Sequence, residues 1–177
     1  MPQSAREHPD SETLFVLEVD CGEAAPRTIC SGLRATHKQA DLEGIDVVVL
    51  TNGKKTEFAG VASDGMVLSG DKKKKPLTLL TVAGKVKPGT PCLPQGYTVR
   101  RTATAHIHAH TSTTLPPLPP PSPPPQCEPV VDFDIRGQFK KLEFKTDKEG
   151  CVLFEGHALE AAGAAVQAIG ISNGKIK

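Results

Sequence analysis

The chain has 177 residues, 38% of them hydrophobic, with 21 basic and 20 acidic side chains and a formal net charge of +1. This length leaves room for one domain, or for one domain with an appendage. A general polycation would be far more basic, so any contact with nucleic acid must come from local clusters of basic residues. No N-terminal stretch has the order of a secretory signal, and the Ala-rich run 158–171 is too short and polar to cross a bilayer, so we expect no membrane contact.

Cysteine usage is typical of reduced thiols in a cytosolic protein rather than of a disulfide framework or a zinc site. The number of cysteines is odd, and no two of them share a C-x-x-C spacing. We therefore expect a cytoplasmic chain without a metal, and no motif indicates a cofactor. The five are Cys21, Cys30, Cys92, Cys127 and Cys151.

Short runs rich in Val, Leu, Ile, Phe and Thr follow one another through the first half of the chain. Turn residues such as Asn52-Gly53 and Asp64-Gly65 separate them. Many short strands at this spacing predict an all-β sandwich or small barrel. The runs span residues 14–20, 27–31, 45–51, 56–62, 66–69 and 77–82.

The stretch from Asn52 to Ser69 joins a predicted buried strand, a basic loop and a second strand. It places Lys54, Lys55 and the hydroxyl of Ser63 on one rim of a sheet, an arrangement that suits phosphate oxygens. No base, nucleophile or metal-ligand cluster lies in it, so it does not suit catalysis. Taken alone, the stretch is better explained as an ordinary hairpin with solvated lysines. The run Lys72–Lys75 is a second candidate, with a solvated loop as its alternative.

From Thr98 to Pro129 the composition changes, and eight of the 16 prolines lie between Pro116 and Pro125. Proline fixes φ and donates no hydrogen bond, so the tract should be a polyproline II linker. Its P-x-x-P spacing also fits an SH3- or WW-type ligand, but a spacer is favoured because such matches occur by chance in proline runs. His106, His108 and His110 alternate and would share a strand face, yet no fourth metal ligand is in view.

The last 49 residues regain apolar runs. Residues 130–133 are typical of a strand and residues 138–145 of a short helix. For Ala158–Ile169 the signals conflict: its alanine content favours a helix, whereas three glycines spaced seven residues apart favour an extended segment.

Several motifs occur in the order found in a known family: residues 8–16, 19–23, 27–33 and 42–44, Asn52, and Ser63-Asp64-Gly65-Met66. The series resembles the tRNA-binding domain of endothelial-monocyte-activating polypeptide II and related synthetase cofactors. Similar domains end many methionyl- and some tyrosyl-tRNA synthetases. The tail Gly170–Lys177 is similar to the C-terminus of the polypeptide II branch. The resemblance covers residues 6–89 and, more loosely, 128–177.

This resemblance implies an OB fold, a five-stranded Greek-key barrel, with a small and mostly β C-terminal extension. It implies a brief helical turn at Gln39–Glu43 and an extended segment at 158–169. We expect the barrel in residues 1–98, a proline-rich linker or insertion in 99–128, and an extension in 129–177 that packs on the barrel.

Relatives place a strand directly before the His-Pro motif, where this chain has only Met1–Ala5. The first barrel strand is therefore expected to be missing, which would leave unpaired backbone groups on its neighbour. Two explanations stay open: the sequence is a fragment, or a partner chain supplies the strand. In either case we expect self-association through the open strand edge.

The family domain docks on the outer corner of folded tRNA and recognises its shape. The resemblance implies that this chain binds tRNA in the same way. The amine of Lys54 would pair with a phosphate, and the hydroxyl of Ser63 would hydrogen-bond a sugar or phosphate. Met66 would pack against a ribose or base, with packing in the hydrophobic core as its alternative. Glu57 and Ala59 stand where the family usually carries basic residues, so affinity would be weak or the contact would move to the second lysine run. The expected RNA-binding residues are Asn52, Lys54, Lys55, Ser63, Met66, Lys72, Lys73, Lys74 and Lys75.

The scarcity of aromatic residues also favours recognition of shape. OB folds that hold single strands stack bases on aromatic side chains, but this chain has one Tyr, no Trp and six Phe. A duplex-like corner lined by phosphates needs cations and hydroxyls instead.

The sequence thus predicts a non-catalytic module that binds tRNA and delivers it to an aminoacyl-tRNA synthetase or a synthetase complex. Glu57, Ala59 and the near-neutral charge favour an alternative, a protein-interaction scaffold or cytokine-like fragment with weak or lost RNA binding. The signatures His-x-Gly-His and Lys-Met-Ser-Lys-Ser and a phosphate loop do not occur. A catalytic domain on a longer parent chain stays open.

Overall fold

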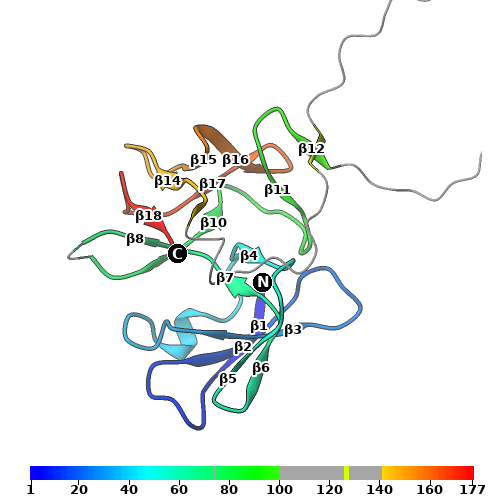
Figure 1. Ribbon diagram of the computed structural model, residues 1–177, viewed down its shortest axis with the longest axis vertical. Helices are drawn as coiled ribbons and strands as arrows, with labels where there is room; N and C mark the ends of the chain where they lie inside the picture. The colour runs from blue at the N-terminus through cyan, green and yellow to red at the C-terminus, as the bar shows by residue number, and fades with distance from the viewer. Residues whose placement is uncertain (74, 100–125, 128–140) are drawn as a thin grey trace, which may run out of the picture.

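The N-terminal part of the chain forms an antiparallel meander of β1 (Pro2–Glu7), β2 (Phe15–Val19) and β3 (Arg27–Ser31). The computed structural model describes residues 1–73, 75–99, 126–127 and 141–177, and the meander lies at one end of it (Figure 1). Its middle strand, β2, is buried along most of its length because it pairs on both sides.

β1 shows that the expectation of a missing first strand is wrong. Pro2–Glu7 pairs with β2, while β3 pairs with the other edge of β2. Proline, glutamine and serine carry little strand propensity, which is why the local sequence did not indicate a strand. Pro2 is tolerated because it begins the strand, and it is buried together with Ala5. The pairing removes the open edge of β2 through which self-association was expected.

Two short hairpin-like pairs follow, β4 (Val49–Leu50) with β7 (Met66–Val67) and β5 (Thr56–Phe58) with β6 (Val61–Ser63). The run 56–62, expected as one strand, is a hairpin because Ala59 and Gly60 turn the chain with φ of +42° and +81°. The helical turn expected at 39–43 is confirmed as the 3-10 helix η1 (Gln39–Asp41). In the described part of the chain, no helix has the length and apolar character needed to span a membrane.

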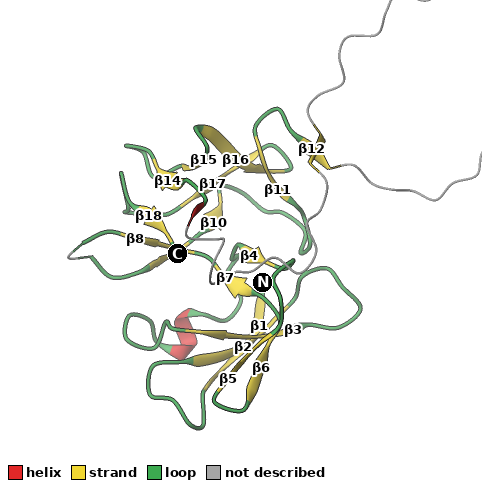
Figure 2. Cartoon of the chain, viewed as in Figure 1, coloured by secondary structure: helices red, strands yellow, loops and turns green. Residues whose placement is uncertain are grey.

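The remaining strands build a second, larger sheet from both halves of the chain (Figures 1 and 2). Its order is β10-β17-β16-β15-β14-β18-β8-β9, and β11 pairs with β16. β12 (Thr98–Val99) pairs in parallel with β13 (Gln126–Cys127) outside this sheet. The sheet strands are β8 (Ser69–Asp71), β9 (Thr78–Leu79), β10 (Thr81–Val82), β11 (Cys92–Pro94), β14 (Phe144–Thr146), β15 (Val152–Phe154), β16 (His157–Ala161), β17 (Ala164–Gln167) and β18 (Lys175–Ile176).

The extended reading of residues 158–169 is confirmed, because β16 and β17 pair as a hairpin that turns at Ala162 and Gly163. Of the predicted helix at 138–145, residues 138–140 lie outside the described residues, and Phe144 begins β14. The proline-rich tract, the three alternating histidines, the strand predicted at 130–133 and Lys74 also lie outside the described residues. The domain bounds stay a prediction.

Two hydrophobic cores share the strands that lie between them. Val67 and Leu79 point into the first core, and the next residues, Leu68 and Leu80, point into the second. This follows from the two-residue period of a strand. The first core is Ala5, Phe15, Leu17, Val19, Ile29, Leu33, Leu42, Val67 and Leu79; the second is Val48, Leu68, Leu80, Val152, Leu159, Val166, Ala168, Ile171 and Ile176.

Candidate nucleic-acid interface

Arg27, at the start of β3, fixes the loop that follows β4. Its guanidinium donates to the carbonyl of Thr51 at 2.8 Å and to the carbonyl of Asp64 at 3.2 Å. It also forms a two-pronged ion pair with Glu23, at 2.6 and 2.8 Å, which lowers the pKa of that carboxyl and raises the pKa of Arg27. Arg27 therefore ties together three segments that are far apart in the sequence.

The loop held in this way presents the first lysine pair. Lys54 is exposed and forms no ion pair within the described part of the chain. Lys55 is 73% exposed and lies 3.0 Å from Asp64, an ion pair that solvent screens strongly. Asn52 is half-buried beside them. We name Asn52, Lys54 and Lys55 the loop-52 surface, because the structure brings these three expected site residues together.

Ser63 has an internal role. It is 2% exposed, and its hydroxyl accepts from the backbone N–H of Cys30 at 3.0 Å and donates to the carbonyl of Gly65 at 3.1 Å. Gly65 has a φ of +143°, and a Cβ there would lie 3.0 Å from the carbonyl oxygen of Leu50. The Ser-x-Gly-Met motif thus builds the turn beside the loop-52 surface. Met66 is half-buried and packs against the second core.

The hairpin β5–β6 next to this loop carries both departures from the family pattern. Glu57 is exposed and pairs in register with exposed Ala62, so its carboxylate faces solvent. Ala59 occupies the positive-φ turn position. A carboxylate on this exposed face works against an anionic ligand.

His8 anchors the same hairpin, and no role was expected for it. Its ring is 2% exposed; Nδ1 accepts from the N–H of Asp10 at 3.1 Å, and Nε2 bonds the carbonyl of Phe58 at 2.9 Å. Because an N–H donates to Nδ1, the proton of the neutral ring lies on Nε2 and is donated to Phe58. The His-Pro motif was visible in the sequence, but its partner is 50 residues away.

The second lysine run lies elsewhere, in the connection between β8 and β9 on the larger sheet (Figure 1). The amine of Lys72 donates to the carbonyl of Ser172 and that of Lys75 to the carbonyl of Gly170, both at 2.7 Å. Lys73 is exposed. The expected site residues therefore form two separate clusters.

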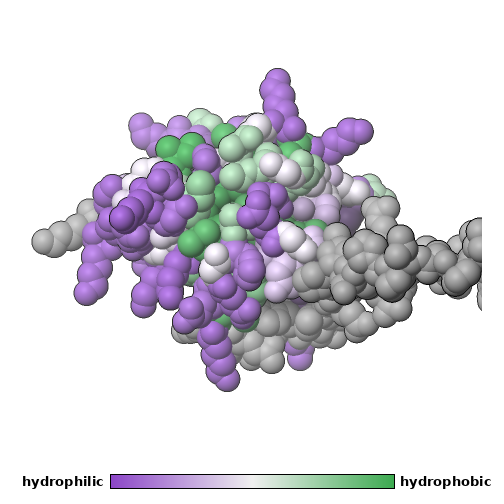
Figure 3. Space-filling model, turned by 90° about the horizontal axis from the view of Figure 1, so that it is seen from above, coloured by the Kyte–Doolittle hydropathy of each residue, from purple (hydrophilic) through white to green (hydrophobic). Residues whose placement is uncertain are grey.

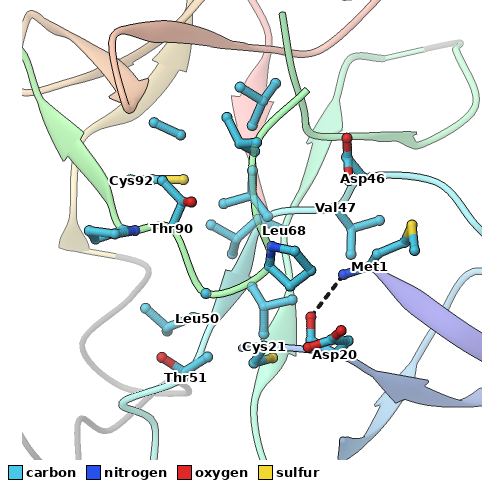
Figure 4. Close-up of a pocket in the computed structure, with 18 of the residues that line it drawn as sticks. Met1, Asp20, Cys21, Asp46, Val47, Leu50, Thr51, Leu68, Thr90 and Cys92 are labelled. Carbon is cyan, nitrogen blue, oxygen red and sulfur yellow. Dashed lines mark hydrogen bonds between the residues drawn. The ribbon is translucent and has the colours of Figure 1, made fainter. Parts of the chain in front are cut away.

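A cleft of about 500 Å³ is lined by the loop after β10, the β2–β3 turn and β4 (Figure 4). The N-terminal amine of Met1 donates to the carbonyl of Asp20 at its edge, at 2.9 Å. Cys21 and Cys92 line it, and burial raises the pKa of both thiols. A raised pKa disfavours the reactive thiolate, so neither thiol has the character of a catalytic nucleophile.

Comparison with known proteins gives relatives that match about half of the chain. The cytoplasmic methionine–tRNA ligase of Caenorhabditis elegans is 39% identical over 93 residues, 52% of this chain. Aminoacyl tRNA synthase complex-interacting multifunctional protein 1 of Mus musculus is 41% identical over 83 residues, 47% of this chain. The matched parts span 10% and 27% of these relatives' own length.

A solved structure matches almost the whole fold. The C-terminal domain of Plasmodium vivax p43 aligns over 99% of this chain and 92% of that chain, with a TM-score of 0.74 at 22% identity. This likeness and the strand arrangement show an all-β architecture consistent with an OB-fold domain and its extension. The family described as "Putative tRNA binding domain" matches residues 3–91, which is half of the chain, and the chain therefore belongs to that family.

Proposed function

We propose that the chain binds folded tRNA through shape and phosphate contacts and delivers it to an aminoacyl-tRNA synthetase or a synthetase complex. Family membership supports tRNA as the ligand. The printed names of the relatives, a methionine–tRNA ligase and a protein that interacts with the synthase complex, support the synthetase as partner. Tethered tRNA gains effective concentration near the enzyme, so the module needs no chemistry of its own and acts without catalysis in the cytoplasm.

The observation that carries the proposal is the loop-52 surface. Arg27 holds the loop by contacts of 2.8 and 3.2 Å, so exposed Lys54 starts from a fixed backbone. On binding RNA, the exposed amine of Lys55 leaves its ion pair with Asp64 and pairs with a phosphate instead. Ser63 and Met66 support the loop from beneath, and exposed Lys73 and Lys75 after β8 supply further cations. Shape-reading contacts of this kind favour folded over unstructured RNA.

The test is tRNA binding by the purified chain across a salt series, with unstructured RNA as competitor. Counterion release gives a slope of about −0.7 to −0.9 in log K against log salt per phosphate, so two to four contacts predict roughly −1.4 to −3.6. Lys54→Ala should flatten this slope by about one unit for all tRNAs alike, because phosphate contacts carry no sequence information. Glu57→Lys should tighten binding.

The matched control is Lys85→Ala, which removes one exposed lysine beyond β10. It should leave the affinity and the slope close to those of the unaltered chain. If Lys54→Ala and Glu57→Lys behave like this control, the RNA does not use the loop-52 surface. Failure of the unaltered chain to prefer tRNA over unstructured RNA would favour the protein-interaction scaffold.

A further inference from the structure

Lysines lie side by side on neighbouring strands of the larger sheet, away from the loop-52 surface. Lys145 of β14 pairs directly with Lys175 of β18, and Lys175 pairs directly with Asp71 of β8. Directly opposed residues of an antiparallel pair point to the same face. Both lysines are exposed, whereas the next residues along their strands, Thr146 and Ile176, are buried.

Further cations surround this pair. Lys177 follows Lys175 by two residues and therefore shares its face, and it is 61% exposed. Lys73 is exposed just beyond the end of β8. We name Lys73, Lys145, Lys175 and Lys177 the C-terminal lysine face. Figure 3 shows hydrophilic side chains gathered on the side of the molecule where Figure 1 places β8, β14 and β18.

Two carboxylates neutralise only part of this charge. Glu143 lies 3.3 Å from the amine of Lys145, and Asp71 lies 2.5 Å from the amine of Lys177. The amines of Lys72 and Lys75 add positive charge at the rim, where backbone carbonyls hold them. Like charges directly opposite each other destabilise a sheet, so the Lys145–Lys175 pair costs stability unless an anion lies between the two amines.

We propose that the C-terminal lysine face is a second RNA-binding surface that contacts the phosphate backbone of the same tRNA; this rests on the proposed function. The face lacks what a protein partner needs, a large apolar anchor. Among the described residues the exposed large hydrophobic side chains are Met1 and Ile169, and neither lies on β8, β14 or β18. Lysines whose backbone positions are fixed about 5 Å apart across strands and about 7 Å apart along one instead suit a row of phosphates.

The two surfaces act independently on the protein. They lie on different sheets, so we expect solvent and salt to screen most of the interaction between their exposed charges. A single folded RNA that reaches both surfaces gains affinity through effective concentration. Each surface therefore contributes its own part of the salt dependence.

The experiment uses the full chain and measures tRNA affinity across a salt series for Lys145→Ala/Lys175→Ala. Loss of two phosphate contacts should flatten the slope by about 1.4 to 1.8 and weaken binding by roughly 25- to 60-fold at 0.1 M salt. Lys145→Arg/Lys175→Arg keeps both charges and should bind like the unaltered chain. Lys85→Ala/Lys87→Ala removes two exposed lysines beyond β10 and is the matched control.

Thermal melts confirm that each variant is folded. If the unaltered chain binds tRNA and the alanine pair behaves like the Lys85/Lys87 control, this inference is wrong while the proposed function stands. Absence of tRNA binding by the unaltered chain overturns both. Displacement of tRNA by poly-glutamate as readily as by unlabelled tRNA would identify an acidic protein as the occupant and overturn the assignment to RNA.

Discussion

Ser63 shows how one buried side chain can fix a turn from inside the fold. Its hydroxyl connects β3 to the turn that begins at Asp64 by bonding Cys30 and Gly65 inside the fold. The Ser-x-Gly-Met motif was recognisable in the sequence, but the direction of the hydroxyl was not. That direction depends on how β3 meets β6, a contact between residues more than 30 positions apart.

Ser63→Ala should lower the free energy of unfolding by about 1–3 kcal/mol, because a buried N–H and a carbonyl lose their partner. Urea unfolding measures this. Ser4→Ala, on the exposed side of β1, is the control and should change stability by less than about 0.5 kcal/mol. A Ser63→Ala variant of normal stability with weakened tRNA binding would show instead that the hydroxyl contacts RNA.

At the scale of elements, the tail motif Gly170–Lys177 forms the turn into β18. Asn173 takes a φ of +51° and donates its N–H to the carbonyl of Asp147 at 2.9 Å. Gly174 donates to the hydroxyl of Thr146 at 2.8 Å. The tail motif is similar to that of the family, and the hydrogen bonds of Asn173 and Gly174 connect the turn before β18 to the end of β14.

Gly174→Ala should destabilise the chain by about 1–3 kcal/mol through overpacking. A Cβ there would lie 2.4 Å from a methyl carbon of Ile171 and 3.0 Å from the carbonyl oxygen of Asp71. Thermal unfolding measures the loss. Gly32→Ala is the control, since its Cβ meets nothing within 4 Å, and it should melt like the unaltered chain. Equal melting temperatures for both variants would contradict the packing described here.

Alternation and turn residues predicted most strands, and they failed where a distant pairing or an unusual backbone conformation decides the structure. The strand at 2–7 depends on pairing with β2, and the hairpin at 56–63 depends on a positive φ at Ala59, which alanine rarely adopts. The segment 158–169 was predicted correctly because the family resemblance, together with the glycines at 156, 163 and 170, outweighed its alanine content. The lysines of the loop-52 surface were found from sequence, whereas the anchors Arg27 and His8 were not.

At the scale of the whole molecule, strand pairing joins the C-terminal extension to the N-terminal part of the chain. β10 pairs with β17, β11 pairs with β16, and β8 pairs with β18. Residues 144–176 complete the second core with Val48, Leu68 and Leu80. A chain ending at residue 98 would expose that face, so we expect the extension to fold together with the barrel.

Limited proteolysis should cut first within 99–128, because this tract is proline-dense and lacks apolar periodicity. The nicked halves should then elute together in gel filtration under native conditions, since they share the second core. Mass spectrometry identifies the cut. Equal cleavage of the barrel strands, or release of a piece 129–177 with its own cooperative melt, would contradict the proposed domain bounds.

The two cores that share the strands around residues 67–80 also limit how the chain can change in length. Val67 faces one core and Leu68 the other, and Leu79 and Leu80 repeat this order. An insertion of one residue within 66–71 or 78–82 would turn the side chains that follow it toward the opposite core. Both cores would then be disrupted together. Insertions and deletions are therefore expected to be tolerated in the connection 72–76 and rejected on either side of it.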